Sequence, residues 1–88
     1  MTQQQEVFVG IDVSKGSLDV AVSSEDQVNQ VGNHRKGITR LVAELRRKNP
    51  CLIVVEATGG YEEAVLSALF NAGLPVARVS PQRVHQYA

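Results

Sequence analysis

Two apolar stretches of this chain each contain one acid: residues 7–13 read VFVGIDV and residues 51–59 read CLIVVEATG. Both have the Val and Ile content of buried β-strands. Asp12 stands near the end of the first strand and Glu56 near the end of the second. A carboxylate withdrawn from water is costly unless something compensates its charge. Two such acids in one small domain therefore require a physical explanation.

The sequence next to the first strand predicts an antiparallel meander. Residues 18–23, LDVAVS, alternate apolar and polar side chains and follow a turn over 14–17, so they pair with the first strand as a hairpin. Residues 28–32 form a short polar strand suited to the edge of a sheet. The first strand thus pairs with the second on one edge, and its other edge is available for pairing with a further strand.

Helices and strands alternate in the second half of the chain. Residues 36–48 and 61–72 have helical periodicity, Gly73 ends the second helix, 74–80 is a strand, and Pro81 opens a third helix. The apolar stripes that predict the two helices are Ile38, Leu41, Val42 and Leu45 in the first, and Tyr61, Ala64, Val65, Ala68 and Leu69 in the second.

This order predicts an α/β fold with a mixed sheet and helices on both faces. With the strands numbered along the chain, their predicted order across the sheet is 3-2-1-4-5. The fourth strand then lies beside the first and parallel to it. Asp12 and Glu56 then converge at the carboxyl end of the sheet, where open α/β folds bind ligands. Taken alone, Asp12 is equally compatible with a turn or a surface ion pair, whereas Glu56, inside the apolar run LIVVEA, fits these alternatives less well.

Composition limits the classes of protein that fit. Eighty-eight residues form one domain, 1–88, with an apolar fraction of 43% and no run of the length that spans a membrane. The start, MTQQQE, lacks the basic and then apolar pattern of a secretory signal peptide. Cys51 is the only cysteine and so forms no internal disulfide, which fits a reducing cytoplasm. We therefore expect a cytoplasmic protein without a membrane partner.

Two convergent carboxylates repel each other, and a divalent cation removes that conflict. Mg²⁺, or Mn²⁺ in its place, prefers hard oxygen ligands and binds through one or two carboxylates together with waters and phosphates. Paired ions of this kind activate oxygens in phosphodiester cleavage. Asp12 and Glu56 are therefore the candidate metal ligands and catalytic residues.

Charge patterning adds candidate contacts to nucleic acid. Residues 27–48 carry six basic side chains and one acid, and residues 1–26 carry five acids and one base. Lys15, directly after the first strand, and Arg40 and Arg47 on the predicted helix are candidate phosphate contacts. A plain turn at Lys15 and a solvated helix face at the two arginines explain the same residues.

The segments GIDVSKGSLDVAV and VVEATGGYEEAVLSALFNAGLPVARVSPQRVHQYA resemble the amino-terminal domain of DEDD transposases of the insertion-sequence-110 group, whose relatives include pilin-gene inversion recombinases. The resemblance runs from Phe8 to Ala88. It implies a ribonuclease H-like, RuvC-resembling fold with four acids, two of which align with Asp12 and Glu56. It also implies DNA strand cleavage and transfer with divalent metal, and in some members a guide RNA encoded by the element.

The family's other two acids form an Asp-x-x-Asp pair downstream of the helix that begins at Pro81, beyond Ala88. We therefore expect the chain to stop before the final helices, to bind metal weakly and to be inactive by itself. A catalytic serine belongs to a separate domain of the family. Self-association to cover apolar surface is also expected, giving a homo-oligomer.

Two other classes of protein remain open. Actin-like sugar kinases and ATPases share the opening hairpin and the strand-one Asp, although Ser14 stands where their phosphate loop has Gly. A non-enzymatic interaction module also fits the absence of the other two acids.

Overall fold

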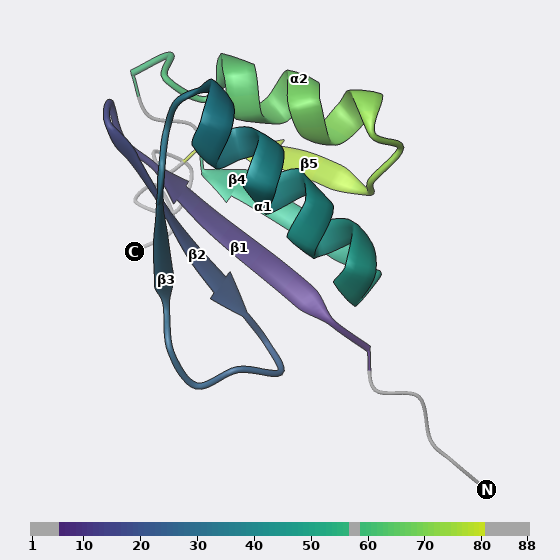
Figure 1. The fold of residues 1–88 in the computed structure, drawn as a ribbon. Coiled ribbons are helices and arrows are strands. Elements are labelled where there is room, and N and C mark those ends of the chain that lie inside the picture. The colour runs from purple at the N-terminus through teal and green to yellow at the C-terminus, as the bar shows by residue number, and fades with distance from the viewer. Residues whose placement is uncertain (1–5, 57–58, 81–88) are drawn as a thin grey trace, which may run out of the picture.

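A computed structural model describes residues 6–56 and 59–80 of the chain, and within them a five-stranded sheet with two helices (Figure 1). No helix in this part is long and apolar enough to cross a membrane. The predicted third helix at Pro81 lies outside the described residues. The elements are β1 (Phe8–Val13), β2 (Ser17–Val22), β3 (Asn29–Gly32), α1 (Arg35–Lys48), β4 (Leu52–Glu56), α2 (Glu63–Asn71) and β5 (Val76–Val79).

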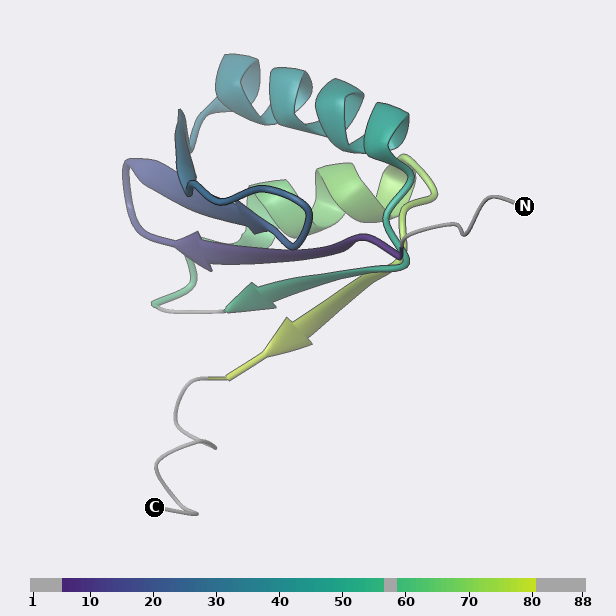
Figure 2. The ribbon, with the colours of Figure 1, turned by 90° about the horizontal axis from the view of Figure 1, so that it is seen from below.

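The sheet order is β3-β2-β1-β4-β5, which confirms the predicted topology. β1 pairs antiparallel with β2 and parallel with β4, and β5 continues the parallel half. The arrowheads of β1, β4 and β5 therefore point to one edge of the sheet (Figure 2). We call this side the carboxyl edge.

Both described helices cover the same face of the sheet (Figure 2). The alternate residues of β1 that face them, Val9, Ile11 and Val13, are almost fully buried. On the other face Phe8 remains 46% exposed. The prediction of helices on both faces is therefore not met by the described part, because the helix predicted at Pro81 lies beyond it. The buried residues that join the core from the other elements are Leu18, Val20, Val22, Ile38, Leu41, Leu45, Ile53, Val55, Val65 and Leu69.

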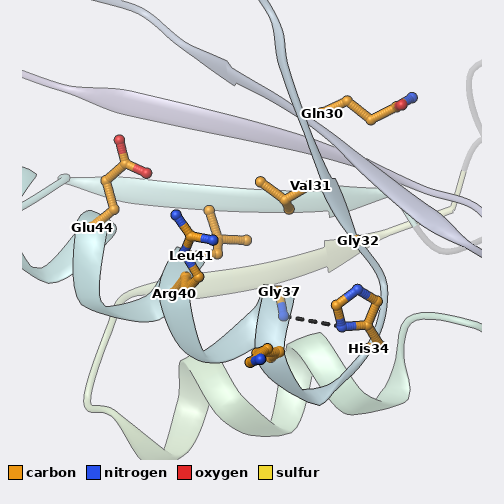
Figure 3. A pocket seen from close by; sticks show the side chains of 9 residues that line it. Gln30, Val31, Gly32, His34, Gly37, Arg40, Leu41 and Glu44 are labelled. Carbon is orange, nitrogen blue, oxygen red and sulfur yellow. Dashed lines mark hydrogen bonds between the residues drawn. The ribbon is translucent and has the colours of Figure 1, made fainter.

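Helix α1 begins tightly against the end of β3. The His34 side chain caps the helix, because its Nδ1 accepts a hydrogen bond of 3.2 Å from the N–H of Gly37 (Figure 3). A side chain at Gly37 would collide with the carbonyl oxygen of Gly32. The absence of a Cβ at Gly37 thus permits the first helical turn to lie directly on the β3 backbone. At the other end Asn49 adopts a left-handed conformation and closes the helix as predicted.

Helix α2 begins later than its sequence pattern predicts, and this changes which side chain is buried. The two residues before Tyr61, Gly59 and Gly60, have positive φ and form a turn that delays the helix to Glu63. Tyr61 is consequently 46% exposed, so its assignment to the core was wrong. Glu62 is 1% exposed instead, because it lies one helical turn before Val65 on the buried side.

Glu62 is the one buried charged residue of the described part, and Arg78 of β5 pairs with it. The Glu62 Oε2 lies 3.1 Å from Arg78 Nη2 and accepts a hydrogen bond of 3.2 Å from Nε. The second oxygen, Oε1, has no hydrogen-bond partner among the described residues. The pair ties the start of α2 to the edge strand β5.

Replacing Arg78 with Met should lower the free energy of unfolding by about 1–3 kcal/mol, because the buried Glu62 carboxylate would lose its counter-ion. Urea unfolding followed by circular dichroism measures this change. The matched control is Arg47→Met on the exposed side of α1, for which we expect a change within about 0.5 kcal/mol. Equal changes for the two substitutions would contradict a specific contribution of the Glu62–Arg78 pair to the free energy of unfolding.

Candidate functional site

The predicted acids meet across the sheet in a row that also contains a third acid. Asp12 of β1 is the register partner of Glu56 on β4, at the last paired position of that parallel ladder. On its other side Asp12 is the register partner of Asp19 on β2. Register partners point to the same face of a sheet, so Asp19, Asp12 and Glu56 form one acidic row at the carboxyl edge.

The acidic row lies on the face that no described helix covers. Asp12 is exposed, whereas Asp19 and Glu56 are partly buried. All three line an open hollow of about 410 Å³. The rest of its lining is small or apolar: Gly10, Ile11, Ala21, Val28 and Val54. The row thus sits at the rim of an open apolar surface with space for a ligand.

The row is electrostatically uncompensated within the described residues. The two ion pairs of that part, Lys48–Glu25 and Arg78–Glu62, involve none of its carboxylates. Among the described residues only Asp19 of the three has a side-chain hydrogen-bond partner, since Nε2 of Gln30 donates to its Oδ1 over 3.0 Å. Three like charges on adjacent strands repel one another, so binding of a cation at the row would relieve this repulsion.

The donor chemistry of Asp12 and Glu56 fits a divalent cation, because carboxylate oxygens are hard ligands of the kind Mg²⁺ prefers. Within residues 6–56 and 59–80, however, no three acidic, histidine or cysteine side chains lie close enough to hold an ion by themselves. Asp12 and Glu56 are thus a pair of candidate ligands, and further oxygens must come from water, substrate or other residues. Asp19 of β2 is the third acid in register with them.

The candidate nucleic-acid contacts fall in two separate places. Lys15 is exposed in the turn between β1 and β2, at the carboxyl edge. Arg40 and Arg47 are exposed on α1, which covers the opposite face of the sheet. Arg40 borders a different hollow of about 390 Å³ between β3 and α1, with His34 and Glu44 (Figure 3). The structure therefore does not bring the two arginines together with the acidic row.

Two residues that sequence reasoning did not single out also act at this edge. The Gln30 side chain donates a hydrogen bond to Asp19, and the Asn33 side chain donates hydrogen bonds to both loops that follow β1 and β4. Amide side chains in polar loops carry no periodic signal, and their partners here are remote in sequence. Their role is therefore visible only in the folded chain.

A mixed sheet in the order β3-β2-β1-β4-β5, with acids at the carboxyl ends of β1 and β4, defines a ribonuclease H-like domain of the RuvC type. The chain is similar to a solved structure described as "Thermus thermophilus RuvC structure", with a TM-score of 0.55 and 26% identity. The match covers 91% of this chain and 65% of the RuvC chain, so the chain spans less than two thirds of that relative.

Residues 9–88 match the family described as "DEDD_Tnp_IS110: Transposase". The chain belongs to this transposase family, which confirms the resemblance drawn from its motifs. No curated protein sequence matches the chain.

Replacing Asp12 with Asn in metal-free buffer should raise the free energy of unfolding by about 0.2–1 kcal/mol, because it removes the central like charge of the row. Urea unfolding with a chelator present measures the gain, and Asp26→Asn, in the exposed loop before β3, is the matched control. The gain should shrink in about 1 M salt, where screening is stronger. A loss of stability in the Asp12 variant would contradict the repulsion described above.

Proposed function

We propose that this chain supplies the first half of a metal-dependent DNA cleavage and strand-transfer site in a DEDD transposase. Asp12 and Glu56 are the proposed metal ligands and catalytic carboxylates. The observation that carries this proposal is their register pairing at the carboxyl ends of two adjacent parallel strands, on an open face of a RuvC-like sheet. Membership in the transposase family supports DNA as the substrate.

Mg²⁺ or Mn²⁺ is the proposed cofactor. Asp12 and Glu56 would hold such an ion, and the ion would supply the positive charge that phosphodiester cleavage requires. Asp19 adds a third negative charge beside them, which would attract cations. In this proposal residues 1–88 form one domain, which needs the two further acids of the family to cleave DNA.

The proposed partners are DNA and, in the whole transposase, a guide RNA and further copies of the protein, acting in the bacterial cytoplasm. Lys15 is the proposed phosphate contact beside the acidic row. Arg40 and Arg47 are proposed to contact phosphates along α1, on the other side of the sheet. One straight duplex lying on the acidic row does not reach both arginines, so the proposal assigns them to a separate stretch of nucleic acid.

The actin-like kinase reading is not favoured by the family match. An interaction module without chemistry remains the second candidate, since no three metal-ligating side chains converge within the described part. Metal binding at the acidic row separates these two functions, because a module selected only for protein contacts has no reason to bind cations there.

Mn²⁺ added to the isotopically labelled chain at up to about millimolar concentration should broaden the amide signals of Gly10–Val13 and Val54–Glu56 together. The double variant Asp12→Asn, Glu56→Gln should lose this effect. Asp26→Asn, which changes an acid outside the row, should retain it. Unchanged signals in the unmodified chain, or equal broadening in the double variant, would contradict the proposed metal site.

Binding of short duplex DNA at low salt should weaken when Arg40 and Arg47 are replaced with Ala. The slope of log affinity against log salt should fall in magnitude by about 2, since each lost phosphate contact removes about 1. Fluorescence anisotropy over a salt series measures the slope. Lys48→Ala is the control, because Lys48 is already paired with Glu25. An unchanged slope in the double variant would contradict the proposed phosphate contacts of Arg40 and Arg47.

A further inference from the structure

The loops that follow β1, β3 and β4 gather at the carboxyl edge of the sheet (Figures 1 and 2). Asn33, in the loop after β3, hydrogen-bonds to the other two. Asn33 itself lies between β3 and α1. Its side-chain Nδ2 donates to the carbonyl oxygen of Ser14 over 2.9 Å and to that of Tyr61 over 3.1 Å. Ser14 follows β1 directly, and Tyr61 lies in the loop between β4 and α2. One amide group therefore bridges the loops that continue from the two strands bearing Asp12 and Glu56.

The hydrogen-bond chemistry at Asn33 requires a side chain with two donor hydrogens, which its amide nitrogen supplies. Both partners are backbone carbonyl oxygens, which only accept hydrogen bonds, so the two N–H groups of Asn33 are both satisfied. The Asn33 backbone N–H adds a third bond, to the Gly16 carbonyl oxygen over 3.1 Å. Asn33 as a residue is partly buried, and the two side-chain hydrogen bonds lie on the exposed side of the loops. No other side chain of residues 6–56 and 59–80 hydrogen-bonds to both loops.

This bridge stands where the β1–β4 ladder ends. Asp12 and Glu56 are the last register pair, and beyond it the two chains leave for separate loops. Terminal pairs of a ladder open more easily than internal ones, because they have a neighbour on one side only. Mutual repulsion of the acidic row adds to this tendency. A link between the two departing loops opposes the opening from outside the ladder.

We propose that Asn33 is a positioning residue, which holds the loops after β1 and β4 together and thereby keeps Asp12 and Glu56 at the spacing that binds a divalent cation. Asn33 acts through the backbone of both loops and touches neither the carboxylates nor the ion. The part of this inference that concerns metal rests on the proposed function. The link between the loops stands on the hydrogen bonds alone.

The first test uses the unmodified chain without metal. Both Nδ2 protons of Asn33 should give separate nuclear magnetic resonance signals and exchange slowly with water, unlike those of the exposed Asn29. Rapid exchange of the Asn33 protons, at the rate seen for Asn29, would overturn the link. This measurement needs no variant and so does not depend on whether a substituted chain folds.

The second test compares Asn33→Ala and Asn33→Asp with Asn29→Ala as the matched control on β3. Amide hydrogen exchange should speed up at Ser14–Ser17 and at Tyr61–Glu62 in both Asn33 variants, and in neither region for the control. The Asp variant keeps the size of the side chain but places acceptors against two carbonyl oxygens, so its effect should be at least as large as that of Ala. Faster exchange in one loop only would overturn the bridge.

The third test measures Mn²⁺ affinity by line broadening at Gly10–Val13, well below the melting temperature of each variant. Loss of Asn33 should weaken the affinity about tenfold, the lower end of what supporting groups around metal ligands contribute. A merely structural role would lower the melting temperature and leave the affinity unchanged, which would overturn the positioning role. If the unmodified chain binds no Mn²⁺ but hydrogen exchange still speeds up in both loops of the Asn33 variants, the proposed function is contradicted. The bridge between the loops then still stands.

Discussion

The parallel ladder between β1 and β4 joins two strands that are separated in the chain by a hairpin, an edge strand and a helix. Its register sets Asp12 opposite Glu56 and places both at the end of the pairing. The same ladder buries Val9, Ile11 and Ile53 beneath the helices, so the core and the acidic row depend on one register. A slip by one residue would exchange the two faces of the strand and bury the carboxylates.

The two faces of the sheet carry opposite requirements. The helix-covered face is apolar and closely packed, and its burial supplies the stability of the domain. The open face carries three acids in a row, with Asp19 beside Asp12 and Glu56, at a cost in mutual repulsion. Such a local conflict is common where a protein binds a ligand of opposite charge, because the ligand removes it. The open face is therefore where this chain departs from what stability alone favours.

Most of the fold could be predicted because its signals are periodic. Alternation in the strands and the apolar stripe of α1 identified the elements, and the connection rules for α/β proteins gave the sheet order. The pairing of Asp12 with Glu56 followed from that order. Tyr61 was misplaced because the glycine turn before it delays α2, which puts Glu62 on the buried side. Helices on both faces stay a prediction, because the helix expected at Pro81 lies outside the described residues.

The order of elements, the apolar face of each and the position of an acid at the ends of two strands follow from the amino-acid sequence, because these features depend on residues within a few positions of one another. The folded chain was needed to place Asp19 in the row, to pair Arg78 with Glu62 and to show that Asn33 bridges two loops. These contacts depend on which backbone and side-chain groups meet after remote segments pack, and no local pattern records that.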